Sequence, residues 1–410
     1  MHANPLLDDL TTRVLQEIGK FGLCSASIRH YRKTYNKLRE FASAKGVDSF
    51  SNRLIDSFIQ DVGEKYQAGQ FSTRRRNHLR RAALLLRDYA ANGSIEWKTT
   101  SWRIQPMPVS QRFLLLHEKF IFNLQSCGKS ANTIQSCKNA VRLFLLFLED
   151  NGCSTLSMAT PEMVPAFFQH LLATYKPRSI RTVASWIRSF LQFSEEDRLL
   201  RAVPSRCVRD IPIIPILSDA EYNALLRVLQ DSEVRLRDKA IILLALRTGL
   251  RAVDIVGMRL EDIDWVTDSI AITQAKTRAP LKIPLTVDVG NLLSAYILNE
   301  RPKSDSPFVF LRSRAPFKEL CGRSACYGLV RQVFHRAGIR LGSERKGIHV
   351  LRHSAASNML SHGVPITTIS SMLGHTNKSS TDVYLSTNEE GMKACALDLA
   401  EIPMNCGGLA

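Results

Sequence analysis

The most informative part of the sequence for the fold is a pair of stretches near the carboxyl end, HVLRH (349–353) and LGHTNKSSTDVYL (373–385). Their polar residues follow one another at intervals of 3, 23 and 9 residues: His349, Arg352, His375 and Tyr384. Upstream, TGLRAVDI (248–255) contributes Arg251 and AKTRAPLKIPL (275–285) contributes Lys276. Guanidinium, imidazole and ammonium groups can bind and polarise a phosphate diester, and a tyrosine hydroxyl can attack it. The six residues therefore predict breakage and rejoining of a nucleic-acid backbone, with no metal and no nucleotide cofactor.

The sequence around these motifs predicts a helical domain with one small hairpin. The stretch from Ser218 to Glu221 has the pattern of a capping box ahead of an apolar helix, and AIILLAL (240–246) fits a buried helix. In DSIAITQAKTRAPLKIPL (268–285), β-branched residues alternate around a polar turn. This alternation predicts a small antiparallel hairpin with Lys276 near its tip. From about residue 290 the apolar spacing returns to that of helices.

The first half of the chain contains two related segments. SASIRHYRKTYNKLREFASAKG (25–46) resembles SANTIQSCKNAVRLFLLFLEDNG (130–152), with Ile28, Phe41 and Gly46 matched at a constant offset of 106. STRRRNHLRRAALLLRDYA (72–90) pairs more loosely with SIRTVASWIRSFLQFS (179–194). Apolar residues recur at spacings of three and four, so each unit is expected to form four or five amphipathic helices. Duplication explains the fixed offset, and the alternative is two helical bundles that merely resemble each other.

Two proline-containing breaks divide the chain. IQPMPVSQ (104–111) separates the two units, and RAVPSRCVRDIPIIPIL (201–217) precedes the last domain. Prolines at these intervals disfavour helix and suit an extended connector. We therefore predict a mainly α protein of three domains. These are an N-terminal helical DNA-binding-like repeat (1–105), a core-binding helical domain (112–203), and an α-rich catalytic domain with a small antiparallel β-sheet and a C-terminal tail (212–410).

The composition favours a polyanionic partner. The 410 residues carry a formal net charge of +17, and the sequence pI is about 9.7. A membrane surface is the rival polyanion, but no apolar run approaches the length of a membrane span. The start, MHANPLLDDL, is acidic where a signal peptide would be basic, so we expect a soluble, cytoplasmic protein. Nine scattered cysteines without a CxxC pair are expected to be reduced, mostly buried thiols rather than zinc ligands.

A run of arginines gives the first helical unit a candidate nucleic-acid surface. Residues 1–111 carry 18 Lys and Arg against 10 Asp and Glu. The residues expected to contact DNA phosphates are Arg74, Arg75, Arg76 and Arg80, with Arg181 in the second unit. Such contacts position a protein on DNA and make its binding salt-dependent, but they carry no base information directly. The alternative is an ordinary solvated helix face.

With these motifs in view, the chain resembles the tyrosine recombinases of the phage integrase family. The resemblance covers roughly residues 212–395 and, more weakly, the helical domain before them. It rests on TGLR, on a lysine in a predicted hairpin, and on the spacing of HVLR, LGH and Tyr384. It implies SAM-like, core-binding helical domains ahead of the catalytic domain. Many relatives have one such domain, whereas two are expected in this chain.

The resemblance also implies roles for the six residues. Arg251 and Arg352 would clamp the phosphate, which agrees with the ability of a planar guanidinium fork to bind two oxygens. Tyr384 would be the nucleophile, aided by His349 as a base, and His375 would donate a hydrogen bond to a non-bridging oxygen. Lys276 would protonate the departing 5′ hydroxyl, leaving a 3′-phosphotyrosine.

Several alternatives remain open for these assignments. Lys276 lacks the neighbouring glycine that is usual in the family, so Lys282 is its substitute. His353 lies four residues after His349, but the glutamate of a metalloprotease motif is missing, and we interpret His353 as structural. Tyr296 and Tyr327 are rival tyrosines, although neither follows a glycine-histidine pair.

The implied partners are double-stranded DNA with paired recombination sites and three further copies of the chain in a homotetramer. An accessory directionality factor is a further candidate partner, and no membrane is expected. The expected activity is site-specific DNA recombination, as in integration, excision or resolution by an element's recombinase. The alternatives are a type IB-like DNA topoisomerase and a catalytically silent DNA-binding relative.

Overall fold

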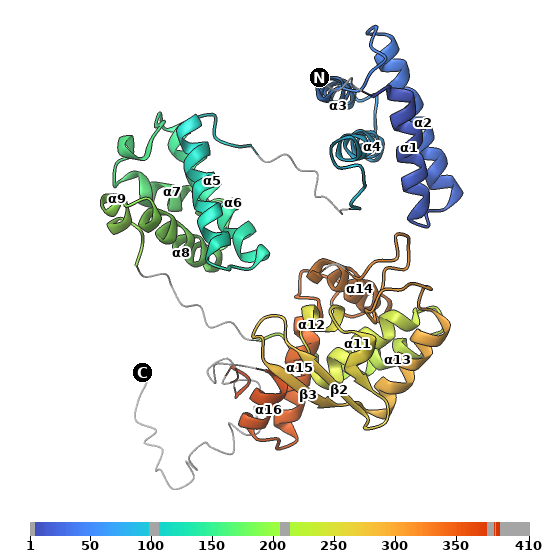
Figure 1. Ribbon diagram of the computed structural model, residues 1–410. Helices are drawn as coiled ribbons and strands as arrows, with labels where there is room; N and C mark the ends of the chain where they lie inside the picture. The colour runs from blue at the N-terminus through green and yellow to red at the C-terminus, as the bar shows by residue number, and fades with distance from the viewer. Residues whose placement is uncertain are drawn as a thin grey trace, which may run out of the picture. The chain divides into compact units, whose positions relative to one another are not determined.

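The protein is mainly helical, as predicted, in a computed structural model that describes residues 5–97, 106–205, 214–320, 322–374, 381 and 383–385 (Figure 1). Packing divides the chain into two compact units, residues 1–99 together with 213–410, and residues 100–212. Separate hydrophobic cores lie within residues 7–97, 113–203 and 217–351. The exact three-domain division stays a prediction.

Residues 5–97 form a bundle of four helices: α1 (Leu7–Lys20), α2 (Ser25–Ser43), α3 (Asn52–Gln67) and α4 (Thr73–Asn92). Their buried residues recur at helical spacing, as Tyr31, Tyr35 and Leu38 do along α2. The hydroxyl group of Ser72 accepts a hydrogen bond from the backbone N–H of Arg75 at 3.2 Å and caps the start of α4. Helix α2 packs against α4, which brings two basic helices together.

Residues 106–205 form a second helical bundle, whose long helices follow one another as those of the first bundle do. It contains α5 (Gln111–Ser126), α6 (Ala131–Asp150), the short 3-10 helix η1 (Leu156–Met158), α7 (Met163–Leu172), α8 (Pro177–Phe193) and α9 (Asp197–Arg201). Helix α6 packs on α8 as α2 packs on α4. The predicted repeats therefore fall on corresponding helices, α2 with α6 and α4 with α8. Gly46 and Gly152 both have positive φ just after the matched helices α2 and α6.

Residues 214–374 fold around one buried helix. The helices are α10 (Asp219–Gln230), α11 (Leu236–Thr248), α12 (Ala252–Val256), α13 (Val287–Asn299), α14 (Gly322–Arg336), α15 (Ile348–Ser361) and α16 (Ile366–Leu373), with the 3-10 helix η2 (Leu260–Asp262). The predicted capping box is present, because Ser218 and Glu221 bond each other's backbone N–H groups. Helix α11 contains AIILLAL and is buried against α13 and α15, as predicted.

The predicted hairpin is the larger part of a three-stranded antiparallel sheet, β1 (Ile263–Asp264), β2 (Ser269–Thr273) and β3 (Pro280–Pro284). Ile270 faces Ile283 across the β2–β3 pair, and both side chains are buried. The connecting turn closes with a hydrogen bond of 2.9 Å from the N–H of Gln274 to the carbonyl of Ala279. Lys276 lies in this turn, so its predicted position near the hairpin tip is confirmed.

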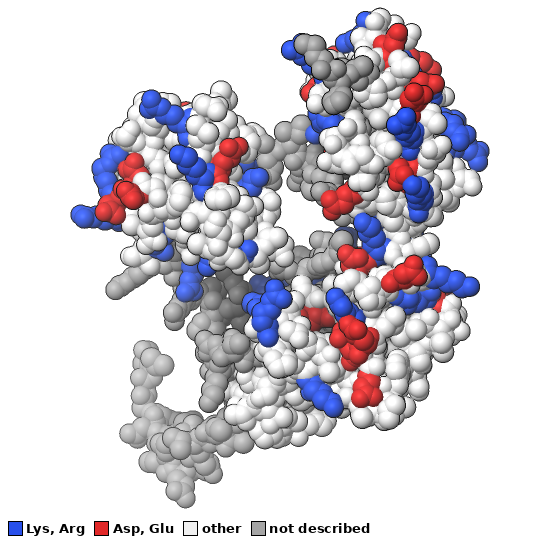
Figure 2. All heavy atoms as spheres, in the orientation of Figure 1, with Lys and Arg blue, Asp and Glu red and all other residues white. Residues whose placement is uncertain are grey.

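Charged side chains are spread over the face of the protein that Figure 2 shows, with Lys and Arg interspersed among Asp and Glu. Among the described residues, no helix has both the length and the apolar character that crossing a membrane requires. Of the five cysteines described, Cys137, Cys153 and Cys326 are buried and Cys24 and Cys127 are exposed.

Candidate active site

Arg251 and Arg352 are brought together by the ends of helices that come from distant parts of the sequence. Helix α11 ends at Thr248, and Gly249 turns the chain with φ of +65° so that Arg251 stands at the start of α12. A Cβ atom at Gly249 would lie 2.6 Å from Cδ2 of Leu373, at the end of α16. Glycine is therefore needed in TGLR both for the left-handed turn and for the close approach of α16.

Arg352 projects from α15 and is only 3% exposed. It donates hydrogen bonds to the carbonyl oxygen of Gly249 at 2.7 Å and to that of Leu373 at 3.0 Å. Neutral carbonyls hold the guanidinium in place without cancelling its charge. Burial and, secondarily, the charge of the neighbouring Arg251 lower the pKa of Arg352 to about 10. The group is still cationic at neutral pH.

Arg251 is held by a buried glutamine that the sequence analysis did not identify. Its Nη1 donates to Oε1 of Gln274 at 3.0 Å, and its Nη2 donates to the carbonyl of Gly374 at 3.2 Å. Gln274 is fully buried, and its Nε2 donates to the carbonyl of Leu373 at 3.3 Å. This glutamine thus ties the hairpin that carries Lys276 to Arg251 and to the end of α16. In the sequence, Gln274 simply follows a segment of alternating pattern, and nothing there indicates that its side chain holds Arg251.

Asp254 links the same elements. Its Oδ1 accepts a hydrogen bond of 2.8 Å from the N–H of Ala275, in the hairpin turn, and its Oδ2 lies 4.0 Å from Nη1 of Arg251. This long ion pair leaves Arg251 available to a phosphate. Two guanidinium groups and one carboxylate leave the described part of the site cationic, which favours an anionic ligand.

Tyr384 lies against this cationic cluster. It is 2% exposed and packs with Ala356, Ile369 and Leu373. Arg352 forms a hydrogen bond with its side chain. Burial raises the pKa of the Tyr384 phenol, and Arg352 acts in the opposite direction. The phenol is therefore protonated at neutral pH in this arrangement.

His353 contacts the same hydroxyl group, which the interpretation of this residue as merely structural did not foresee. Its Nδ1 lies 3.1 Å from Oη of Tyr384. Burial, with smaller contributions from His349 and Arg352, lowers the pKa of His353 to about 4. A neutral imidazole with so low a pKa holds the tyrosine O–H without taking its proton. The sequence places His353 directly after Arg352 and one helical turn after His349, but its contact with Tyr384 depends on how the chain packs against α15.

The remaining predicted residues lie around this cluster or outside the described residues. His349 is exposed on α15, with its ring centroid 6.3 Å from that of His353. Lys276 is exposed in the hairpin turn, and Lys282 is exposed on β3. His375 falls outside the described residues.

The rival tyrosines lack these surroundings. Tyr296 is a core residue that stacks on Phe310, and its hydroxyl accepts a hydrogen bond of 3.2 Å from the N–H of Leu311. Tyr327 lies on α14 and is half exposed. In the described part of the chain, Tyr384 is the tyrosine that joins Arg352 and His353.

The predicted DNA-binding arginines differ in exposure. Arg74 and Arg75 on α4 and Arg181 on α8 are exposed. Arg76 lies over the ring of Tyr66 at 4.2 Å, and Arg80 is half-buried, with a buried Nε atom and a pKa that burial lowers. Arg74, Arg75 and Arg181 are therefore the three best placed to meet a phosphate.

Comparison with known proteins places these residues in a family. Residues 215–390 match the model described as the phage integrase family, and residues 118–197 match that of the phage integrase N-terminal SAM-like domain. A protein of Sinorhizobium fredii named as integrase/recombinase y4gC is 40% identical over 40% of this chain and 83% of its own length. The chain belongs to the phage integrase family. It is thus a tyrosine recombinase by sequence, as the resemblance implied.

Two further relatives are also named as recombinases. The integrase/recombinase y4rA of Sinorhizobium fredii is 32% identical over 65% of this chain and 66% of its own length. Tyrosine recombinase XerA of Pyrococcus furiosus is 28% identical over 67% and 91% of the two chains. The chain thus spans just under two thirds of y4rA and most of XerA.

The solved structure of the XerH site-specific recombinase bound to a palindromic difH substrate shares the fold. Its TM-score is 0.54 at 14% identity, with 72% of this chain and 97% of that chain covered.

Proposed function

We propose that this chain cuts and rejoins DNA strands at specific sites through a covalent intermediate on Tyr384. The observation that carries the proposal is the contact of the Tyr384 side chain with Arg352, in a cluster whose second guanidinium comes from Arg251. Fixed cations aimed at phosphate oxygens stabilise the transition state more than the ground state, because negative charge spreads onto those oxygens as the bond forms. The relatives and the solved structure named above are integrases and recombinases, which favours recombination over the topoisomerase alternative.

In the proposed cleavage step, Oη of Tyr384 attacks the phosphorus atom. The bond between phosphorus and the 5′ oxygen breaks, and a 3′-phosphotyrosine forms. The phenolic proton passes toward His349, and Lys276 supplies a proton to the departing 5′ oxygen. The reverse attack by a 5′ hydroxyl rejoins a strand, so the phosphoester energy is kept and no ATP is needed.

The geometry assigns His353 and Gln274 supporting roles in this proposal. His353 orients the Tyr384 hydroxyl, and Gln274 holds Arg251 against the end of α16. Arrival of a phosphate would bring negative charge beside two arginines and the phenol.

The proposed partners follow from the same reaction. The substrate is double-stranded DNA carrying paired sites, and four copies of the chain exchange strands in pairs. Short inverted repeats in the DNA beside the gene are the first substrate to test. A duplex with such a repeat, nicked beside the cleavage point, loses its short 5′-hydroxyl fragment after cleavage and traps the covalent adduct. A topoisomerase would instead relax supercoiled plasmids that lack the repeats.

A further inference from the structure

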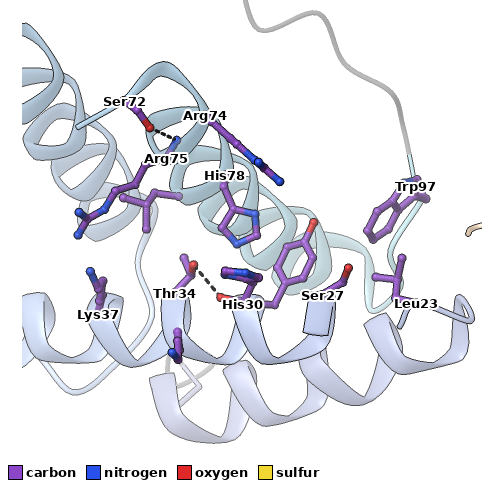
Figure 3. Close-up of a pocket in the computed structure, with 13 residues that line it drawn as sticks. Leu23, Ser27, His30, Thr34, Lys37, Ser72, Arg74, Arg75, His78 and Trp97 are labelled. Carbon is purple, nitrogen blue, oxygen red and sulfur yellow. Dashed lines mark hydrogen bonds between the residues drawn. The ribbon is translucent and has the colours of Figure 1, made fainter. Parts of the chain in front are cut away.

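A groove between α2 and α4 in the N-terminal bundle lies outside the parts of the chain that the family models cover. Its volume is about 670 Å³, and residues between Leu23 and Trp97 line it (Figure 3). The family models begin at residue 118. Lys33 and Lys37 of α2 line one side, and Arg74 and Arg75 of α4 line the other. Figure 3 shows Lys37 and Arg75 pointing toward each other across the groove.

Charge is segregated among the four helices that build this bundle. Helix α2 contains five Lys or Arg and one acidic residue, and α4 contains six and one. Helices α1 and α3 each contain two basic and three acidic residues. The groove therefore lies between the two strongly basic helices of the bundle. An ordinary solvated surface would mix the two signs more evenly.

Within residues 5–97, the groove cations are not neutralised by neighbouring carboxylates. Among the described residues that line the groove, none is Asp or Glu. The ion pairs of Arg39 with Asp8 and of Arg87 with Asp56 lie elsewhere on α2 and α4. Arg75 is held in place instead by the ring of Phe71, 4.1 Å below its guanidinium carbon.

The groove also contains the neutral and dipolar groups that suit a phosphate. The start of α4 opens onto it at Ser72, and the first N–H groups of a helix carry partial positive charge. Ser27 adds a hydroxyl group from α2, whereas the Thr34 hydroxyl is buried and donates to the carbonyl oxygen of His30. Tyr31 and Trp97 are buried, so they offer no open ring on which a base could stack. The groups available are those that contact a nucleic-acid backbone rather than base faces.

We infer that this groove binds the phosphate backbone of duplex DNA and gives the chain a DNA contact separate from those of residues 118–390. The inference rests on the proposed function, which supplies duplex DNA as the partner. A single small anion is a weaker fit, because the four cations Lys33, Lys37, Arg74 and Arg75 are spread over two helices and together suit a row of phosphates. The N-terminal helical unit thus extends the length of DNA that one protomer contacts.

The test compares two charge-matched triple variants of the full chain. The groove variant combines Lys33→Gln, Lys37→Gln and Arg74→Gln. The control variant combines Arg13→Gln, Lys45→Gln and Arg53→Gln, which removes three exposed positive charges from the same bundle outside the groove lining. Binding to a fluorescent mixed-sequence duplex is measured by anisotropy between 50 and 300 mM salt, values chosen to span the steep range of about 50 to 200 mM. Thermal unfolding of each variant checks that the bundle is intact.

The groove variant should lower the slope of log affinity against log salt by about 2 to 3, since each lost phosphate contact removes about 0.9. Its affinity should fall at least about tenfold at 150 mM salt. The control variant should keep a slope within about 1 of the wild type. Equal slopes for the two variants, or no change in the groove variant, would overturn the inference. Should the groove variant unfold at a lower temperature, Lys37→Glu alone replaces it, with Arg13→Glu as its control.

Covalent trapping separates this inference from the proposed function. At saturating protein, the groove variant should trap nicked DNA as fully as the wild type, because the groove does not contain Tyr384. Trapping by the wild type together with equal slopes for both triple variants refutes the groove alone. A groove-specific slope change without any trapped adduct refutes the proposed function alone.

Discussion

The Nδ1 atom of His353 lies 3.1 Å from the hydroxyl oxygen of Tyr384. The two residues are 31 positions apart in sequence; Tyr384 is buried against α15 and α16, and His353 is half-buried on α15. Because the pKa of His353 is near 4 and that of the phenol is above its ordinary value of 10, the proton stays on the tyrosine. The histidine therefore orients the hydroxyl before DNA arrives and does not act as its base.

Two replacements of His353 distinguish its hydrogen bond to the Tyr384 hydroxyl from its contribution to packing. His353→Ala should slow formation of the covalent adduct by up to about 100-fold, the loss expected when a nucleophile is displaced by about 1 Å. His353→Asn places an amide near the position of Nδ1 and should recover most of the rate. Single-turnover trapping on a nicked duplex measures both rates. Equal losses in the two variants would show that the hydrogen bond has no part in positioning Tyr384.

The buried imidazole also predicts how stability depends on pH. The pKa of His353 is about 4 in the folded chain, against about 6.5 when unfolded. Between these values the unfolded state binds more protons, so the free energy of unfolding should fall as pH is lowered from 6.5 to 4. His353→Asn should make this decline shallower. Denaturant unfolding of both proteins at pH 7, 5.5 and 4.5, values chosen to bracket that window, gives the comparison. Parallel curves for wild type and variant would contradict the prediction.

Arg352→Lys tests whether adduct formation requires the planar guanidinium group of Arg352. A lysine ammonium cannot reproduce the two bonds from Arg352 to the carbonyls of Gly249 and Leu373 while facing a phosphate. Adduct formation should slow by about 100- to 1000-fold. Arg247→Lys is the matched control, because Arg247 forms an exposed ion pair of 2.8 Å with Asp288. A similar rate for both lysine variants would remove Arg352 from the proposed clamp.

Gly374→Ala tests the contact between the hairpin and α16. Gly374 has φ of +60°, and a Cβ atom there would lie 2.0 Å from Nε2 of Gln274. The left-handed backbone alone should cost about 1 to 2 kcal/mol of stability, and displacement of Gln274 should add to that loss. In the double variant with Gln274→Ala the steric part is removed, so the two losses should be less than additive. Strict additivity in denaturant unfolding would show that the two residues do not interact.

The motifs in the sequence predicted much of this site, because catalytic chemistry limits which residue types can act. Arg251, Arg352 and Tyr384 do come together, and Lys276 does lie in a hairpin turn. Spacing alone could not give the roles of Gln274 and His353, which depend on how α15, α16 and the hairpin pack. A glutamine that directly follows a strand, as Gln274 does, looks solvent-facing until its neighbours are known.

Much of the fold could also be predicted from the sequence, because helices and caps leave local residue patterns. Apolar spacing predicted helices, and the capping box at Ser218 marked the start of α10 correctly. The short strand β1 was missed, because two residues are too few to show alternation. The groove between α2 and α4 depends on which helix faces meet, and the run of arginines could indicate only that some basic surface exists.

The most direct test of the central claim is the identity of the residue that becomes attached to DNA. A nicked duplex carrying the inverted repeat from beside the gene is incubated with the full chain, and the adduct is digested and analysed by mass spectrometry. We expect a 3′-phosphate ester on Tyr384, and Tyr384→Phe should bind the same duplex without forming any adduct. An adduct on another residue, or strand exchange by Tyr384→Phe, would contradict the account.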